Sequence, residues 1–316
     1  MQSGRMRKAP FAIFALALAA SPVPAQQSGG PFTVEEARRG FATLQEAVDA
    51  IGEGAGTILI APGTYRQCAV QRAGRVRYAA REFGTVTFDG VACDGKAALV
   101  IDGVEARIEG LTFQNIRVPD RNGAGIRLQS GNLIVRESLF RDSEQGILTA
   151  GDPDASIRIE QSTFSGLGIC PEDGDCAHSL YIGDYGSLSV VRSRFERGRG
   201  GHYVKTRAPR VEVVDSSFDD SEGRATNYMI DLSNGATGTI ARNAFVQGRA
   251  KENYSAMIFV GPEAQSNASA GLTIADNDAT LAPGARGTVF VADRSGDGVR
   301  VENNRLGPQI TRYERR

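Results

Sequence analysis

Residues 188–195, with the sequence LSVVRSRF, are followed at 211–218 by VEVVDSSF, and the two stretches share one arrangement of residue types. In each stretch two apolar residues alternate with other residues, a serine follows three positions later, and a phenylalanine stands two positions after the serine. Alternation with a period of two is typical of a β-strand with one buried face. A unit that recurs at this interval indicates a repeat protein.

The same arrangement recurs along most of the chain. Its final apolar residue, called the anchor here, stands at positions 113, 140, 164, 195, 218, 245, 279 and 306. Successive anchors are therefore separated by about 23 to 34 residues, which matches one coil of a solenoid, in which each repeat buries its apolar face against its neighbours. A leucine-rich repeat has a similar length, but its Leu-x-x-Leu-x-Leu rows are absent from the sequence.

A second short strand is predicted in each coil, at residues 125–128, 146–149, 180–182, 203–206, 229–232, 257–260 and 288–291. Two or three strands per coil, joined by sharp turns in a chain with 38 glycines, predict an all-β fold, a right-handed parallel β-helix. The recurring phenylalanines should stack inside the coils as an aromatic ladder, which consists of Phe113, Phe140, Phe164, Phe195, Phe218 and Phe245. A polar ladder at a bend should consist of Ser138, Ser162, Ser193, Ser216 and Asn243.

An amphipathic helix is predicted before the first coil, at about residues 34–51. Apolar residues stand there at the helical spacing of 34, 37, 41, 44, 48 and 51. A β-helix has an open sheet edge at each end, and a helix over that edge prevents pairing with another molecule. We therefore expect one domain over residues 26–316, with a cap helix and with coils over about residues 56–308.

Residues 1–25 have the composition of a secretory signal peptide. Arg5, Arg7 and Lys8 precede an apolar stretch at 9–20, and cleavage is expected after Ala25. The apolar stretch is shorter than the ~20 residues that a membrane-spanning helix needs. The sequence therefore predicts a periplasmic or secreted protein without a membrane span.

The charge balance excludes strongly basic or acidic classes of protein. Three of the 36 basic side chains lie in the predicted leader, and its removal leaves 33 against 37 acidic ones, a net charge of about −4. There is no basic run of the kind that binds nucleic acid and no basic amphipathic helix for a membrane surface. We expect no nucleic-acid partner, and we expect a monomer.

Four cysteines are present, and an exported chain meets an oxidising compartment in which they form disulfides. Four cysteines allow three connectivities, and proximity along the chain favours Cys68 with Cys93 and Cys170 with Cys176. The second pair lies in an insertion at 168–177, where a closed loop would form a rigid acidic wall that includes Glu172, Asp173 and Asp175. A zinc site is the alternative, but no Cys-x-x-Cys pair is present.

The N-terminal part of the mature chain resembles the pectate-lyase-like superfamily of right-handed β-helix proteins. The resemblance is carried by TLQEAV at 43–48, by GTILIAPGTY at 56–65, and then by the repeats over nearly the whole mature chain. It implies the fold more specifically than the chemistry, because the superfamily contains lyases, hydrolases, epimerases, esterases and non-catalytic surface proteins.

Three consecutive second strands carry reactive side chains at one spacing. Their alignment predicts two columns, one of His178, His202 and Tyr228 and one of Tyr181, Lys205 and Asp231. Neighbouring strands lie about 4.8 Å apart, so each column could contact one or two sugar rings. His178 and His202 are the only histidines in the sequence, and their equivalent places favour a function. The structural alternative is an exposed polar ladder with a Lys205–Asp231 ion pair.

These residue types suit β-elimination of a uronate polysaccharide or oligosaccharide. Elimination needs a cation on the carboxylate, a base for the C5 proton and an acid for the leaving oxygen. Arg207 suits the first task, Lys205 or His202 the second, and Tyr181 or His178 the third. Asp231 would orient Lys205, and Asp231, Tyr228, Arg207 and Asp184 would bind substrate.

Alternatives stay open beside the lyase prediction. In the resembling lyase families, Lys and Arg often do this work, sometimes with calcium held by acidic residues. This face has only Asp231 and Asp184, so we expect no cofactor and do not favour calcium or a two-carboxylate glycoside hydrolase. A C5-epimerase shares the proton abstraction. A non-catalytic protein that binds acidic glycans or assists envelope assembly would need the cations and tyrosines but not the paired histidines.

Overall fold

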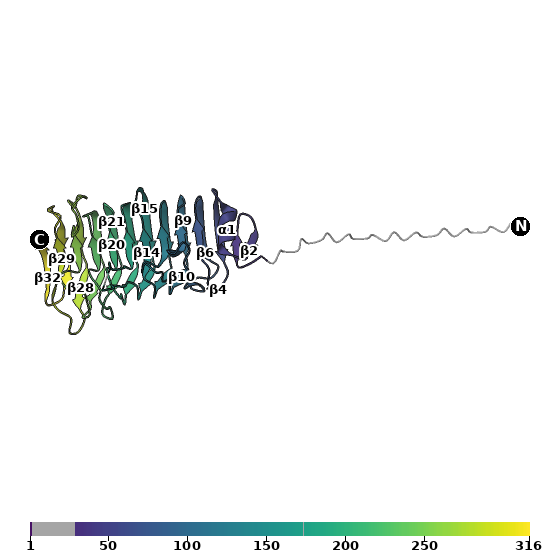
Figure 1. Ribbon diagram of the computed structural model, residues 1–316. Coiled ribbons are helices and arrows are strands. Elements are labelled where there is room, and N and C mark those ends of the chain that lie inside the picture. The colour runs from purple at the N-terminus through teal and green to yellow at the C-terminus, as the bar shows by residue number, and fades with distance from the viewer. Residues whose placement is uncertain (2–28, 173) are drawn as a thin grey trace.

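The computed structural model describes Met1, residues 29–172 and residues 174–316. Figure 1 shows an elongated solenoid whose strands stack from helix α1 (Leu44–Ile51) at one end to β32 (Ile310–Arg315) at the other. Each coil adds one strand to each of three parallel sheets, which confirms the predicted all-β parallel solenoid. Its right-handed sense stays a prediction, supported by the general preference for right-handed crossovers between parallel strands. Apart from Met1, the predicted leader and its cleavage site lie outside the described residues.

The three sheets are named here A, B and C in the order in which the chain visits them. Sheet A contains β3 (Ala55–Ile60), β6 (Arg75–Ala80), β9 (Glu105–Glu109), β12 (Asn132–Arg136), β15 (Asp152–Glu160), β18 (Tyr185–Val191), β21 (Arg210–Val214), β24 (Thr237–Ala241), β27 (Thr273–Ala275) and β30 (Arg300–Glu302). Sheet B contains β4 (Gly63–Tyr65), β7 (Val86–Asp89), β10 (Leu111–Gln114), β13 (Leu139–Arg141), β16 (Thr163–Ser165), β19 (Arg194–Glu196), β22 (Ser217–Asp219), β25 (Ala244–Gln247), β28 (Asp278–Leu281) and β31 (Arg305–Leu306). Sheet C contains β5 (Ala69–Gln71), β8 (Ala97–Ile101), β11 (Ala124–Leu128), β14 (Gln145–Thr149), β17 (Leu180–Ile182), β20 (Val204–Thr206), β23 (Ile230–Leu232), β26 (Ile258–Val260), β29 (Thr288–Asp293) and β32.

The predicted aromatic ladder runs through sheet B. Phe113, Phe140, Phe164, Phe195, Phe218 and Phe245 are paired in register from coil to coil. Their ring centroids lie 4.8 to 5.1 Å apart with nearly parallel planes. This separation equals the spacing of neighbouring strands, so each ring packs on the next. Phe88 and Tyr65 extend the ladder toward the N-terminal end.

The predicted polar ladder lies at the bend between sheets A and B. The residue before each ladder residue has a positive φ, as at Arg192 (47°) and Asp215 (54°), and this turns the chain from one sheet to the next. A backbone N–H at such a bend needs a partner when it is buried. The ladder side chains supply that partner, since the backbone N–H of Ser193 donates to Ser216 Oγ at 3.1 Å. The same contact recurs at Ser138, Ser162, Ser216, Asn243 and Asn277.

The predicted helix over 34–51 is wrong in its first half. The chain forms a hairpin of β1 (Phe32–Val34) and β2 (Arg39–Phe41), and β1 pairs antiparallel with β3. A strand satisfies the hydrogen-bonding groups of the free edge of sheet A, which a helix could not do. The helix begins only after Thr43, whose side chain forms a capping box with Glu46.

Helix α1 still contributes to the end of the solenoid. The side chain of Gln45 accepts a hydrogen bond from the backbone N–H of Val70 at 2.7 Å and donates one to its carbonyl oxygen at 3.0 Å. Val70 lies in β5, the terminal strand of sheet C, so one amide side chain pairs with that strand's free edge. Among the described residues, no helix is long and apolar enough to cross a membrane.

Both predicted disulfides are present. Cys68 is bonded to Cys93 and Cys170 is bonded to Cys176, and no cysteine among the described residues is free. The first disulfide joins two successive coils near the N-terminal end, and the second closes a loop that lies beside the candidate site. Paired cysteines are consistent with folding in an oxidising compartment.

Candidate functional site

Both predicted columns are present, one on the outer face of sheet C and the other directly before its strands. Tyr181 pairs with Lys205, and Lys205 pairs with Asp231, in the register of β17, β20 and β23. In the other column the rings of His178 and His202 stack at 4.9 Å between centroids, and His202 stacks on Tyr228 at 5.2 Å. Sequence alignment of the coils therefore identified both the strands and the neighbours within each column.

The second column is a network of charges rather than an exposed polar row. Lys205 is only 5% exposed, and its Nζ lies 3.2 Å from Asp231 Oδ2 and in a short ion pair with Glu263. Arg207 Nη2 lies 2.6 Å from the other oxygen of Glu263, and Arg207 Nη1 donates to the hydroxyl of Tyr181 at 2.6 Å. One carboxylate, that of Glu263, therefore bridges the two cations of the site.

Glu263 was missed by the sequence analysis. It belongs to the segment after β26, in the long coil between the anchor positions 245 and 279, and its side chain is 43% exposed. The backbone N–H groups of Glu263 and Ala264 both donate to the carbonyl oxygen of Ser233 at 3.0 Å, which fixes this segment over β23. The unusual length of the coil was the only signal in the sequence, and it did not identify the residue.

Asp231 is held by three groups although it is almost fully buried. Besides Lys205, it lies 3.1 Å from His202 Nε2, and it accepts a hydrogen bond from Ser233 Oγ at 3.1 Å. Burial raises the pKa of Asp231, while the charge and hydrogen bond of Lys205 oppose that rise. A buried carboxylate with these partners is a fixed support for Lys205 and is not open to a bulky ligand.

Both histidines are neutral at ordinary pH. Burial, together with the positive charges of Lys205 and Arg207, lowers the pKa of His178 to about 3. Burial and the neighbouring His178 hold the pKa of His202 well below its usual range. His178 Nδ1 accepts a hydrogen bond from the backbone N–H of His202 at 3.0 Å, so its proton is on Nε2. His202 Nδ1 is buried and has no hydrogen-bond partner among the described residues.

Glu263 and the half-buried Arg207, at the outer side of the network, have shifted pKa values as well. Burial alone would raise the pKa of Glu263, but its hydrogen bonds and ion pairs with Lys205 and Arg207 outweigh burial and lower it. Burial would lower the pKa of Arg207, and contact with Tyr181 and Glu263 outweighs it and raises the pKa. The two cations of the site are therefore balanced by two carboxylates of the chain itself, those of Asp231 and Glu263.

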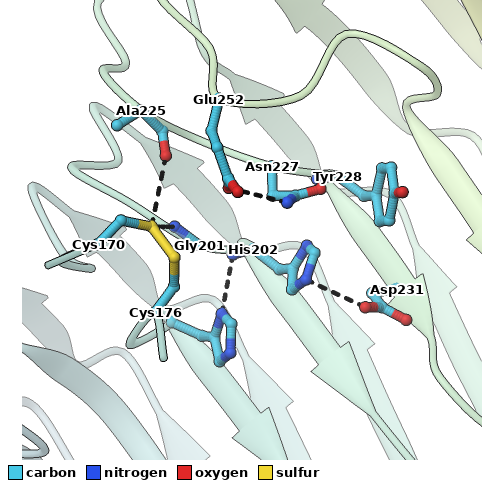
Figure 2. Close-up of a disulfide and its surroundings, with 10 residues drawn as sticks. Cys170, Cys176, Gly201, His202, Ala225, Asn227, Tyr228, Asp231 and Glu252 are labelled. Carbon is cyan, nitrogen blue, oxygen red and sulfur yellow. Dashed lines mark hydrogen bonds and ion pairs between the residues drawn. A yellow bond between two sulfur atoms is a disulfide. The ribbon is translucent and has the colours of Figure 1, made fainter. Parts of the chain in front are cut away.

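The disulfide loop borders the histidine column, as Figure 2 shows. Cys170 Sγ accepts a hydrogen bond from the backbone N–H of Gly201 at 3.1 Å, and Gly201 directly precedes His202. Glu172 and Asp175 of the predicted acidic wall are exposed, and Asp173 lies outside the described residues. Glu252 approaches the two sulfurs, but these are bonded to each other and leave no thiolate for a metal ion.

A groove of about 670 Å³ opens beside Tyr181. One wall is the disulfide loop, with Pro171, Gly174, Asp175 and Cys176, and the other is the segment 119–122. The groove is also lined by Arg127, Leu148 and Tyr181, which follow one another in register on β11, β14 and β17. The register of Arg127 with the Tyr181 column could have been found from the sequence, whereas the two walls could not.

Tyr228 and Asp184 are the remaining predicted residues, and only Tyr228 borders the site. Tyr228 accepts a hydrogen bond from Asn253 at 3.0 Å and packs edge-on against Phe259, so it borders the site on its C-terminal side. Asp184 lies in the turn after β17, and no hydrogen bond or ion pair within residues 29–172 and 174–316 joins its side chain to the network. The sequence analysis named Asp184 as the second carboxylate of this face beside Asp231, whereas in the structure Glu263 is the second carboxylate that contacts Lys205.

Comparisons with known proteins give little beyond this geometry. No protein-family model and no curated protein matches the chain. Among solved structures, the chain is similar to a PL6 family alginate lyase, AlyGC, with a TM-score of 0.38 and 12% sequence identity. The match covers 81% of this chain and 40% of the lyase chain, so this chain spans less than half of that protein.

Proposed function

We propose that the protein is a polysaccharide lyase that cleaves an acidic, uronate-containing polysaccharide by β-elimination. The observation that carries the proposal is the contact of one carboxylate with both Lys205 and Arg207 beside an open groove. A pair of cations that holds the carboxylate of Glu263 can hold the carboxylate of a uronate in the same way. The periplasmic or secreted location that we expect would bring such an enzyme to its substrate.

Arg207 would neutralise the uronate carboxylate and so make the C5 proton acidic. Lys205 would first pass its proton to the Asp231 carboxylate, which lies 3.2 Å from Nζ. The neutral amine would then take the C5 proton, the electron pair would form the C4–C5 double bond, and the bond from C4 to the leaving oxygen would break. Tyr181 would give its hydroxyl proton to that oxygen. Arg207 donates to the Tyr181 hydroxyl, which leaves the hydroxyl proton free for the leaving group.

Lys205 and Tyr181 are better placed for these steps than the two histidines. Tyr181 lines the groove, and Lys205 is its register neighbour, with Nζ 5.7 Å from the ring centroid. His202 Nε2 is already paired with Asp231, and His178 Nδ1 already accepts the backbone N–H of His202. We therefore assign His202 to the positioning of Asp231, and Asp231 to the positioning of Lys205.

Calcium and hydrolytic mechanisms have less support from the donor set. Calcium takes six to eight oxygen ligands, and here Asp231 and Glu263 are both committed to cationic side chains. A glycosidase needs two carboxylates free on either side of the bond. Glu263 adds a second carboxylate near Asp231, but both are ion-paired with the same ammonium group of Lys205.

A non-catalytic protein that binds acidic glycans is the second candidate, because Arg207 and Lys205 would serve it equally well.

The deciding experiment incubates the mature protein with a panel of uronate polysaccharides and follows the ultraviolet absorbance of the unsaturated product. We expect a rise with one of them, lost in Lys205→Ala and in Tyr181→Phe and retained in Tyr313→Phe, a control in β32. Binding without a rise on any polymer would favour the glycan-binding protein. C5 deuterium exchange without chain cleavage would favour an epimerase.

A further inference from the structure

A Gly-Arg pair recurs in three successive coils at the corner between sheets B and C. The pairs are Gly198-Arg199, Gly223-Arg224 and Gly248-Arg249, which follow one another at an equal interval along the chain. We define the arginine corner as residues 197–199, 221–224 and 249–250, which surround a hollow of about 590 Å³. The proposed function uses none of these residues.

A buried network beneath the arginine corner accounts for the glycines. Lys251 and Asp220 form an ion pair at 3.0 Å with both side chains fully buried, and Tyr203 donates to the same carboxylate at 2.7 Å. A Cβ atom on Gly223 would lie 1.9 Å from Asp220 Oδ1, and one on Gly248 would lie 2.0 Å from the Asp220 carbonyl oxygen. Only glycine fits against the network, and the arginine that follows each glycine lines the hollow.

The network also fixes the acidic turn at 219–222, because the side chain of Asp220 faces Lys251 in the interior. Breaking a fully buried ion pair leaves an uncompensated charge, so this network fixes the backbone of the corner. The arginines thus stand on a rigid base rather than on free loops.

The guanidinium groups of the arginine corner are largely available to a ligand. Arg199 pairs with Asp142 at 2.8 Å, and Arg197 is 3.7 Å from Glu222, the one acidic residue of the lining. Across the part of the chain that the structure describes, no hydrogen bond or ion pair involves the guanidinium of Arg224 or Arg249. Four arginines around one hollow therefore carry an excess of positive charge.

We propose that the arginine corner is a second binding site for an anionic polysaccharide, outside the groove in which the bond would be cleaved. The hollow has the volume of a site for a sugar-sized group, larger than a single oxyanion needs. Arg224 and Arg249 come from successive coils about 4.8 Å apart, which suits acidic groups repeated along a polymer. The identity of the glycan rests on the proposed function, but the binding site does not.

The arginine corner is distinct from the Lys205 network but close to it. Arg199 precedes His202 by three positions, so the two backbone positions are no more than ~11 Å apart. Between them, Cys170 lies against Gly201 and the carbonyl of Ala225. A polymer held on both sides of the disulfide loop would bind more tightly than at either site alone.

The test compares Arg224→Ala/Arg249→Ala with Arg210→Ala/Arg300→Ala, which removes two exposed arginines from sheet A. Calorimetry would measure the dissociation constants of polygalacturonate, dextran sulfate and a galacturonate disaccharide. We expect the first variant to bind a polymer about tenfold more weakly, with the disaccharide unchanged and the control within about twofold of the original protein. In the first variant, the binding constant for the polymer should depend less steeply on salt concentration, by an amount that corresponds to the loss of about two ionic contacts.

Equal polymer affinities in the two double variants would overturn the proposal. The proposal would also be overturned if inorganic sulfate displaced the polymer fully when its concentration equals that of the charged groups on the polymer. The hollow would then be a site for small oxyanions. The two proposals fail separately. A polymer affinity lost in Arg224→Ala/Arg249→Ala supports the second site even if no polymer gives an unsaturated product, and cleavage without any such loss removes the second site alone.

Discussion

Replacement of Glu263 by glutamine should tighten the binding of an acidic saccharide at the Lys205–Arg207 pair. The Glu263 carboxylate contacts both cations, with Arg207 Nη2 at 2.6 Å, so a uronate carboxylate must displace it before binding. Glutamine has nearly the same shape but no charge, and it cannot compete with a carboxylate for two cations. The variant therefore measures how strongly the chain's own carboxylate opposes the substrate.

The expected magnitude follows from the exposure of the ion pairs. Glu263 is 43% exposed, so solvent screens both contacts and each is worth at most about 1 kcal/mol. Loss of both would favour the ligand by up to ~2 kcal/mol, or about 30-fold in Kd. The glutamine amide oxygen keeps part of the hydrogen bonding, so we expect Kd to fall by between about 3-fold and 30-fold.

Calorimetric titration with a short oligogalacturonate measures this effect directly. Glu302→Gln is a matched control, because Glu302 is an exposed glutamate on β30 of sheet A and its loss changes the net charge equally. An unchanged Kd in the control, with a lower Kd in Glu263→Gln, would support the reasoning. Equal or weaker binding in Glu263→Gln would refute it, because the ligand carboxylate would then not share the site of Glu263.

Three further predictions concern stability. Between about pH 6.5 and 3 the unfolded chain protonates His178, whereas the folded chain, in which the pKa of His178 is about 3, does not. Acidification to pH 5 should therefore lower the free energy of unfolding by about 2 kcal/mol through His178 alone. His202, whose pKa is also lowered, acts in the same direction, and Asp231, whose pKa burial raises, acts in the opposite one. The pH dependence should be weaker in urea titrations of His178→Gln. Phe195→Ala should lower the free energy of unfolding by about 3 to 5 kcal/mol, measured in guanidinium, because its ring stacks at 4.9 Å on both neighbours; a loss below about 1 kcal/mol would contradict the packing. The free energy of unfolding of Cys170→Ala/Cys176→Ala should be lower by about 2 kcal/mol, because the disulfide no longer restricts the entropy of a loop of this length in the unfolded chain. Thermal unfolding measures this loss, and an unchanged melting temperature would mean that the loop is fixed without its disulfide.

The register of the coils could be predicted from the sequence because each coil repeats one strong constraint. A phenylalanine shifted by one position, such as Phe164, would turn from the core to the solvent, so the anchors fix every strand of sheet B. The same register then aligns sheet C and brings Tyr181 beside Lys205. The prediction of residues 34–51 as one helix was wrong because Val34 and Phe41 have the apolar spacing of a helix but belong to a hairpin that closes the edge of β3.

Contacts made by segments between the strands could not be predicted in this way. Glu263 lies far from Lys205 along the chain, and the carbonyl of Ser233 positions it beside Lys205 through two backbone hydrogen bonds. Nothing in the repeat specifies where such a segment folds. The buried pair of Asp220 and Lys251 was missed as well, because charged residues are mostly exposed and nothing in the repeat places these two side chains in the interior.

The two longest coils explain why the reactive side chains gather on three strands of an otherwise regular solenoid. The coil between anchors 164 and 195 inserts the disulfide loop before His178, and the coil between anchors 245 and 279 brings Glu263 back over Ser233. These segments approach the face of β17, β20 and β23 from opposite ends, so the strands supply the column while the insertions supply its wall and its internal carboxylate. Shortening the coil that carries Glu263 should therefore change ligand binding at Lys205 while leaving the aromatic ladder, which lies in sheet B, in register.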